Sequence, residues 1–310
     1  MLSAMGRFGV RAAGVAAALL IVAGACAQSA QPAPATGSSQ GRYRVVVVDG
    51  HPRTYWVHRP AGLGTTNAVP LVVMLHGGFG NGAQAEKSYG WDAMADAHGF
   101  VVAYPDGISN AWNAGTCCGL PQRTNVDDVG FIGAVIDKLV ADEHVDRSHV
   151  YVTGISNGAF MAYRVACELP GGVAAIGPDA GTMIVPCDRA VPTSVLHIHG
   201  LADQNVPYNG GVGTKGVAKD SRPSVPATIA RWRSIDGCGP STVTTAGPVH
   251  TDASSCAGGR AVTLITIDGA GHQWPGSQPP NPAAKAALGL DDPSPALDAT
   301  AVLWQFFSQH

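Results

Sequence analysis

Residues 151–160 read YVTGISNGAF, and the segment 154–158 places Ser156 between two glycines directly after a β-branched run. The pattern Gly-x-Ser-x-Gly is typical of the sharp turn that carries a nucleophilic serine between a strand and a helix. The chain contains 40 glycines among 310 residues, so chance alone supplies about 0.3 copies of the pattern. The rest of the sequence must therefore distinguish a nucleophile from an ordinary glycine-rich turn.

Strand and helix signals alternate on both sides of this motif. Apolar or β-branched runs predict strands at 43–48, 55–58, 70–75, 100–104, 149–153, 173–176, 194–198 and 261–267. Apolar residues at helical spacing predict helices at 126–143, 159–169, 225–235 and 300–307. This alternation favours one α/β domain, with a mostly parallel central sheet covered by helices on both faces. In such sheets the chemistry lies at the carboxyl ends of the strands.

The amino terminus has the pattern of an export signal. Arg7 and Arg11 precede an uncharged apolar stretch at 12–25, which is too short to span a bilayer comfortably. Cys26 follows directly, and VAGAC at 22–26 resembles a bacterial lipobox, in which the cysteine thiol receives a diacylglycerol. We expect a lipoprotein held at the outer face of a cell membrane through Cys26, with secretion of an unlipidated protein as the alternative.

The segment after Cys26 has the composition of a flexible linker. AQSAQPAPATGSSQG at 27–41 is uncharged and rich in Pro, Ala, Ser and Gln, so it offers no material for a core. The chain is thus expected to divide into a signal peptide at 1–25, a lipidated flexible tether at 26–41 and a folded catalytic domain at 42–310.

Charge is sparse and nearly balanced. Charged residues make up 13% of the chain, and the formal net charge is −3. This balance gives no electrostatic footprint for nucleic acid, so no nucleic-acid partner is expected. An uncharged or weakly polar substrate fits better, and membrane contact is expected only through the lipid on Cys26.

Six of the seven cysteines remain for disulfides if Cys26 is lipidated. Export implies an oxidising compartment, and an even number of thiols suits disulfide pairing. We favour a bond between Cys238 and Cys256, which would join two late elements of the domain. The sequence leaves the pairing of the other four open: Cys117, Cys118, Cys167 and Cys187.

Ser156 lies at a predicted strand-to-helix junction, where a nucleophilic serine belongs. Its hydroxyl needs a general base, which is itself oriented by a carboxylate, and in hydrolases of this architecture the chain order is serine, acid, histidine. Asp203 follows the strand at 194–198 and His272 follows the strand at 261–267. We therefore predict Ser156, Asp203 and His272 as the catalytic residues.

Three other side chains compete for these roles. Asp179, after the preceding predicted strand, is the alternative acid. His76 and His199 are alternative bases, although both positions are more typical of histidines that form structural hydrogen bonds at the start of a loop.

An acyl-transfer site also needs backbone N–H groups that stabilise the tetrahedral oxyanion. LHGGFG at 75–80 follows a buried strand, where such a loop belongs. The predicted donors are the amides of Gly78 and of Asn157, the residue after the nucleophile.

No metal and no cofactor are expected. His197 and His199 share one face of a predicted strand, but no third ligand stands at a suitable spacing. The acidic residues Asp291, Asp292 and Asp298 are more typical of a solvated loop and a helix N-cap than of a calcium site.

Two tryptophans lie in predicted loops near the site. Trp112 and Trp274 are candidates for the floor of an acyl or aryl pocket. Packing that rigidifies the two loops is the alternative.

Six stretches together resemble the family of secreted α/β-hydrolase esterases that includes polyhydroxybutyrate depolymerases, feruloyl esterases and acetylxylan esterases. They are LHGG (75–78), WNAGTCCG (112–119), VDDVGFI (126–132), GISNGAFMAYRVACE (154–168), HGLADQNVPY (199–208) and GAGHQWPG (269–276). The resemblance covers roughly 43–307 and implies an α/β-hydrolase fold in which Ser156, Asp203 and His272 correspond to the family's triad. It also implies that Asp127 and Asp128 cap a helix and support a loop.

The sequence therefore predicts a serine carboxylic-ester hydrolase that forms an acyl-enzyme on small-molecule or polymeric esters. One alternative is an acyltransferase that uses a sugar or lipid hydroxyl as the acceptor, and another is a catalytically silent binding protein on the same fold. The acyl and alcohol groups of the substrate and the oligomeric state are left open.

Overall fold

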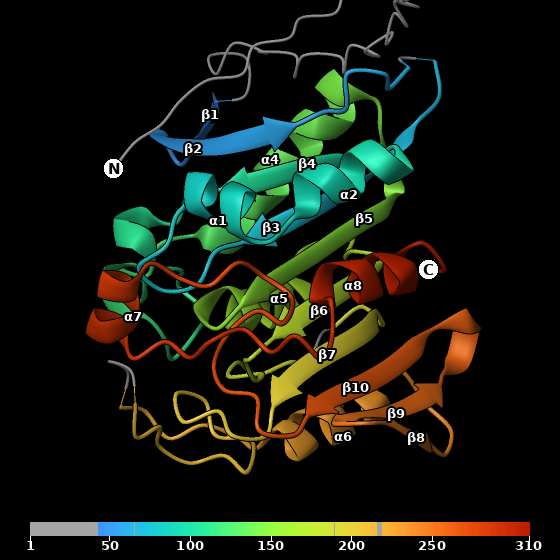
Figure 1. The fold of residues 1–310 in the computed structure, drawn as a ribbon. Coiled ribbons are helices and arrows are strands. Elements are labelled where there is room, and N and C mark those ends of the chain that lie inside the picture. Colours follow the sequence, from blue (N-terminus) through green and yellow to red (C-terminus); the bar gives the residue numbers. More distant parts are fainter. Residues whose placement is uncertain (1–42, 65, 189, 216–218) are drawn as a thin grey trace, which may run out of the picture. The chain divides into compact units, whose positions relative to one another are not determined.

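The computed structural model describes residues 43–64, 66–188, 190–215 and 219–310 (Figure 1). The predicted signal peptide, Cys26 and the tether lie outside the described residues. Within these ranges, no helix combines the length and the apolar character that crossing a bilayer requires.

A ten-stranded sheet forms the centre of the domain, in the order β1-β2-β4-β3-β5-β6-β7-β10-β9-β8. The strands are β1 (Tyr43–Val48), β2 (His51–His58), β3 (Val69–Leu75), β4 (Val101–Pro105), β5 (Val145–Ile155), β6 (Ala175–Asp179), β7 (Ser194–Gly200), β8 (Thr242–Ala246), β9 (Val249–Ser255) and β10 (Ala261–Ile267). The six strands from β4 to β10 along the sheet are parallel, and an antiparallel pair extends each side. The carboxyl ends of the parallel strands therefore share one edge.

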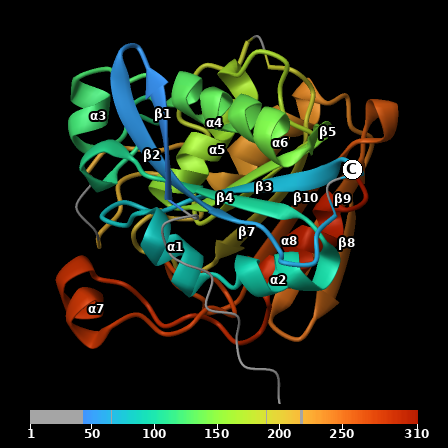
Figure 2. The ribbon, with the colours of Figure 1, turned by 90° about the horizontal axis from the view of Figure 1, so that it is seen from above.

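Helices cover both faces of the sheet (Figure 2). They are α1 (Gly82–Ser88), α2 (Trp91–His98), α3 (Gly119–Arg123), α4 (Asp128–Glu143), α5 (Asn157–Glu168), α6 (Val225–Ile235), α7 (Pro282–Leu288) and α8 (Ala299–Phe307), with single 3-10 turns at Ile108–Asn110 and Ala257–Gly259. Helices α4, α5 and α6 lie on one face, and α1, α2 and α8 lie on the other. The chain thus has the mostly parallel, two-sided α/β architecture that the sequence predicts.

Each face holds its own apolar core. On the α4–α5–α6 face, buried side chains such as Phe131, Tyr163 and Trp232 pack against the central strands. On the other face, Tyr151 of β5 stacks on Phe307 of α8 with ring centroids 4.8 Å apart. Strands buried on both faces explain why β3 and β5 appear in the sequence as continuous apolar runs.

The structure contains elements that the sequence analysis did not predict. The hairpin β8–β9 lacks an apolar run because every residue of β8 is exposed. Helices α1, α2, α3 and α7 have only five to eight residues, too few for a helical period to be recognised. The strand predicted at 149–153 extends over Val145–Ile155 and so runs directly into the Gly-x-Ser-x-Gly motif.

Three disulfides join the six cysteines of the domain. Cys238 is bonded to Cys256, the pair that the sequence favours, and this bond links the end of α6 to the end of β9. The pairs left open by the sequence are the adjacent Cys117–Cys118 and the bond Cys167–Cys187. This disulfide content is consistent with an exported protein.

Candidate active site

Ser156 occupies a tight turn between β5 and α5. Its backbone angles are φ +57° and ψ −119°, and a positive φ of this kind is rarely adopted by residues other than glycine. Its N–H donates to the carbonyl of Asp179 at 2.9 Å, which ties the turn to the end of the neighbouring strand β6. Strained backbone of this kind persists only where surrounding structure holds it, and it is concentrated at functional sites.

The two glycines of the motif allow this turn to pack against strand β3. A Cβ atom on Gly154 would lie 2.8 Å from the carbonyl oxygen of Leu75, and one on Gly158 would collide with the same oxygen. Any side chain at either position would push the turn away from the end of β3. The motif is therefore a packed corner that brings Ser156 next to the loop after Leu75.

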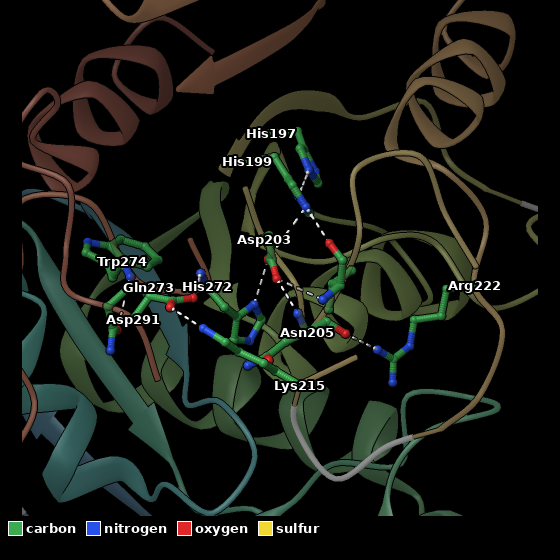
Figure 3. A network of polar contacts seen from close by, with 11 residues as sticks. His197, His199, Asp203, Asn205, Lys215, Arg222, His272, Gln273, Trp274 and Asp291 are labelled. Atoms are coloured by element: carbon green, nitrogen blue, oxygen red, sulfur yellow. Dashed lines mark hydrogen bonds and ion pairs between the residues drawn. The ribbon is translucent and has the colours of Figure 1, made fainter. Parts of the chain in front are cut away.

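Asp203 and His272 are in direct contact. His272 Nδ1 lies 2.7 Å from Asp203 Oδ2, and both side chains are buried (Figure 3). The other carboxylate oxygen of Asp203 accepts hydrogen bonds from the N–H groups of Asn205 (2.8 Å) and Val206 (2.9 Å). Because a carboxylate only accepts, Nδ1 carries the proton and Nε2 is left free to act as a base.

The environment of Asp203 keeps it ionised. Burial alone raises the pKa of this carboxyl, but the charge and hydrogen bond of His272, the nearby His199 and the Val206 amide bring the net pKa below its usual value. Asp179 behaves in the opposite way, because burial and the neighbouring Asp203 raise its pKa well above the usual range. Asp203, and not the alternative Asp179, is thus the carboxylate on His272.

Ser156 and His272 approach from strands of the same sheet edge, the carboxyl ends of β5 and β10. Among the described residues, no hydrogen bond joins the Ser156 hydroxyl to the His272 ring. Catalytic hydrogen bonds are often long in the unliganded state and tighten when substrate binds.

Asp291 is a site residue that the sequence analysis missed. It was assigned to a solvated loop, but its Oδ2 accepts a hydrogen bond from the backbone N–H of His272 at 2.9 Å. Its Oδ1 pairs with Lys215 Nζ at 2.8 Å (Figure 3). Asp298, in contrast, is the N-cap of α8 as expected, since its side chain accepts from the N–H of Ala301.

The loop after β3 contains the predicted oxyanion donor. The amide of Phe79 donates to Asn110 O at 2.7 Å and that of Gly80 donates to Gly77 O at 3.1 Å. The amide of Gly78 has no acceptor among the described residues, and an ideal Cβ on Gly78 would lie 3.9 Å from the Cβ of Asn157. Gly78 therefore has an amide beside the start of α5 that is free among the described residues.

Asn157 is the first residue of α5, so its N–H has no acceptor one helical turn earlier. Its side chain makes two hydrogen bonds to the backbone of Trp112. Oδ1 accepts from the Trp112 N–H at 2.7 Å, and Nδ2 donates to the Trp112 carbonyl at 3.1 Å. This pair of bonds fixes both the helix start and the loop that contains Trp112.

The two tryptophans are buried packing residues. Trp112 is 0% exposed, and its indole N–H donates to the carbonyl of His76. Trp274 is 1% exposed, donates to Thr300 Oγ1 and packs on the ring of Tyr89. In this structure both rings pack the loops, which is the alternative that the sequence left open, and a role of either ring in an acyl or aryl pocket stays a prediction.

Two further expectations concern supporting residues. Asp127 caps α4 by accepting from Gly130 N, and the buried Asp128 accepts from Asn113 N and pairs with Arg53 at 2.7 Å, which matches the predicted capping and loop support. His76, an alternative base, is buried and its Nε2 accepts from the Gly107 amide.

His197 and His199 do not form part of a metal site in the described residues, where no group of three or more His, Cys, Asp or Glu side chains is arranged to hold a metal ion. Instead, His197 Nε2 lies 3.2 Å from His199 Nδ1. Both imidazoles are fully buried, and burial lowers the pKa of each.

The sequence of the chain matches the protein-family model described as esterase PHB depolymerase over residues 54–237. It is 32% identical over 284 residues to a putative esterase NocK from Nocardia uniformis subsp. tsuyamanensis, covering 84% of this chain and 80% of that protein. It is 30% identical over 262 residues to feruloyl esterase C from Emericella nidulans, covering 82% and 83%. The solved acetyl xylan esterase from Aspergillus awamori aligns with a TM-score of 0.55 at 15% identity, covering 86% of this chain and 99% of that one, which supports the fold alone.

Proposed function

Because the chain belongs to the esterase PHB depolymerase family and is a carboxylic ester hydrolase with an α/β-hydrolase fold, we propose that it is a serine esterase with Ser156 as its nucleophile. In this proposal His272 is the general base and Asp203 orients and stabilises its imidazole. The amides of Gly78 and Asn157 form the oxyanion hole.

The proposed reaction has two halves. Ser156 Oγ attacks the ester carbonyl while His272 Nε2 takes its proton, and the negative charge that develops on the carbonyl oxygen is stabilised by the two amides. Collapse of the tetrahedral intermediate transfers the proton to the departing alcohol and leaves an acyl-enzyme. Water, deprotonated by His272, then releases the acid and restores the serine.

The contact between Asp203 Oδ2 and His272 Nδ1, at the same sheet edge as the strained Ser156, is the observation that carries this proposal. An ionised carboxylate on Nδ1 fixes the tautomer in which Nε2 can accept the serine proton. The free amide of Gly78 near Asn157 supports the second part, because donors for an oxyanion must be unoccupied before substrate arrives.

Labelling with a fluorophosphonate probe tests the nucleophile. We expect the wild-type protein to be labelled and to hydrolyse p-nitrophenyl butyrate, and Ser156→Ala to lose both while remaining folded by circular dichroism. Ser308→Ala, at an exposed serine, is the matched control and should keep both properties. Labelling of Ser156→Ala at the wild-type rate would assign the nucleophile elsewhere. Product analysis with an added alcohol distinguishes released acid from a newly formed ester, and thus hydrolysis from acyl transfer.

The substrate proposed here is a carboxylic ester of small or polymeric form. Relatives are named as feruloyl and acetylxylan esterases, so a panel of short-chain, long-chain, feruloyl and acetyl-sugar esters covers the relevant acyl groups. Comparison of kcat/KM across the panel measures how much transition-state binding each acyl group gains in the pocket.

Export and anchoring are part of the same proposal. The leader 1–25 is removed, Cys26 is lipidated and residues 27–41 connect the anchor to the catalytic domain that begins at 42. Expression in a bacterial host with labelled palmitate should give a labelled membrane-bound protein, and Cys26→Ala should lose both the label and the membrane association. An unlabelled, fully released wild-type protein would favour plain secretion.

A further inference from the structure

A row of buried polar side chains runs from helix α5 toward the carboxylate of Asp203. Tyr163 Oη lies 2.9 Å from His197 Nδ1, and His197 Nε2 lies 3.2 Å from His199 Nδ1. All three side chains have no exposed surface. Burying polar groups is costly unless they are paired, and the proposed reaction steps use none of the three. Their arrangement therefore needs an explanation of its own.

The proton positions along this row follow from its last member. His199 Nε2 lies 2.8 Å from the carbonyl oxygen of Val206, which can only accept, so Nε2 carries the proton. Burial lowers the pKa of both histidines, so each ring is neutral and has one N–H. His199 Nδ1 then accepts from His197 Nε2–H, and His197 Nδ1 accepts from the Tyr163 hydroxyl. Each link allows a single tautomer.

The protonated nitrogen of His199 faces the turn that holds Asp203 (Figure 3). Val206 accepts from His199 through its carbonyl and donates through its N–H to Asp203 Oδ1 at 2.9 Å. His199 Nε2 also lies 3.7 Å from Asp203 Oδ2, the oxygen that contacts His272. One N–H group thus fixes the turn and presents a positive dipole to the carboxylate.

We infer that His199 is a positioning residue for Asp203, and that Tyr163 and His197 hold its ring in place by pairing the nitrogen that faces away from the carboxylate. The inference rests on the proposed triad. In the opposite tautomer, the lone pair of His199 Nε2 would face both the Val206 carbonyl and the Asp203 carboxylate. That repulsion would move the turn and weaken the contact between Asp203 and His272. The Val206 carbonyl excludes this tautomer, and the row from Tyr163 pairs the remaining nitrogens of the two buried rings, which keeps His199 in place.

None of the other charged and titratable groups named near Asp203 takes the place of His199 in positioning the carboxylate. His272 is already bonded to Oδ2, and Asp179 is a buried acid that repels the carboxylate. Arg222 attracts Asp203 electrostatically, but the hydrogen bond that its guanidinium makes in this loop is to the carbonyl of Asn205.

A double-mutant cycle tests the inference. His199→Leu and Asp203→Asn are made singly and together, and kcat and KM are measured with p-nitrophenyl butyrate. We expect His199→Leu to lower kcat about tenfold, the rate equivalent of one hydrogen bond, with KM nearly unchanged. In the Asp203→Asn background the same change should have little further effect, because His199 acts through Asp203. His199→Gln, which keeps an N–H donor, should recover most of the rate.

The outcomes separate this inference from the triad on which it rests. An unchanged kcat in His199→Leu would overturn the positioning role and leave the triad intact. So would an equal decrease in kcat when His199→Leu is made in the wild type and in Asp203→Asn. A fully active Asp203→Asn would overturn the triad, and the inference with it. The far-downfield NMR resonance of the His272 Nδ1 proton is an independent readout, since it should weaken in His199→Leu and persist in His199→Gln.

A second pair of variants covers the case in which His199→Leu does not fold. Tyr163→Phe removes only the hydroxyl at the far end of the row, and Tyr151→Phe makes the same change at an equally buried tyrosine of β5 that stacks on Phe307. We expect Tyr163→Phe to lower kcat and weaken the His272 resonance, and Tyr151→Phe to do neither. Equal behaviour of the two variants would overturn the inference.

Discussion

The carboxylate of Asp291 accepts a hydrogen bond from the backbone N–H of His272 at 2.9 Å, although 19 residues separate the two in sequence. Its second oxygen pairs with Lys215 Nζ at 2.8 Å, from a loop that precedes His272 by more than fifty residues. Gly271 allows this approach, because a Cβ there would collide with the Asp291 carboxylate. The loop of the proposed base is thus held by its backbone, independently of the Asp203 contact on its ring.

Asp291→Ala should lower kcat about tenfold with a small change in KM, because loss of one hydrogen bond lets the His272 loop move relative to Ser156. Asp291→Asn keeps an acceptor for the His272 N–H and should keep most of the rate. Asp292→Ala is the matched control, since that neighbouring carboxylate is exposed and pairs with Lys285. Equal rates for the alanine variants of Asp291 and Asp292 would show that the backbone bond is not needed.

The positions of the proposed triad residues could be proposed from the sequence because each lies directly after a strand that the sequence marks. Ser156, Asp203 and His272 each follow a recognisable apolar strand, and the carboxyl ends of parallel strands meet at one edge. The strained turn at Ser156 was predictable for a similar reason, since two glycines at fixed spacing mark it.

The supporting contacts were not predictable. Asp291 lies in a loop without a repeating pattern, and its partner is a backbone N–H that any residue except proline would offer at position 272. For Trp112 the sequence left a pocket floor and loop packing open, and it could not show the two hydrogen bonds between the Asn157 side chain and the Trp112 backbone. The hairpin β8–β9 was not predicted because an apolar pattern in the sequence marks buried residues, and β8 has no buried residue.

Gly158→Ala should destabilise the protein by about 3 kcal/mol or more, because the new methyl group would overlap the Leu75 carbonyl oxygen in a corner that cannot relax without moving β3. Activity should fall with it, since the corner determines where Ser156 points. Gly62→Ala is the control, as no atom lies within 4 Å of the added methyl group. Urea unfolding of both variants measures the difference, and a Gly158→Ala protein as stable as Gly62→Ala would contradict the packing argument.

His76 should make the protein sensitive to acid. Burial lowers the pKa of His76 to about 4, whereas an unfolded histidine titrates near 6.5. Between these values the unfolded chain binds a proton that the folded chain does not, so this stabilisation is complete above about pH 6.5 and is lost as the pH falls toward 4. The loss between pH 7 and pH 5 amounts to about 2 kcal/mol.

Comparison of urea unfolding at pH 7 and pH 5 for the wild type and His76→Gln isolates this contribution, because all other groups titrate in both proteins. The wild type should lose about 2 kcal/mol more than the variant between the two pH values. Parallel losses would mean that His76 does not titrate with the lowered pKa.

The Cys238–Cys256 disulfide should contribute stability without affecting catalysis. The bond closes a loop of 18 residues that contains the β8–β9 hairpin, and β8 buries no side chain that would otherwise hold it. Loop-closure entropy predicts a loss of about 3 kcal/mol when Cys238→Ala and Cys256→Ala are combined. The hairpin forms one edge of the sheet, away from β5. The kcat of the double variant for p-nitrophenyl butyrate at 25 °C should therefore stay within about twofold of the wild-type kcat, a smaller change than the loss of one hydrogen bond in the active site would cause. A large drop in kcat in a variant that is still fully folded would show that the hairpin is coupled to the His272 loop through β10, the strand it pairs with.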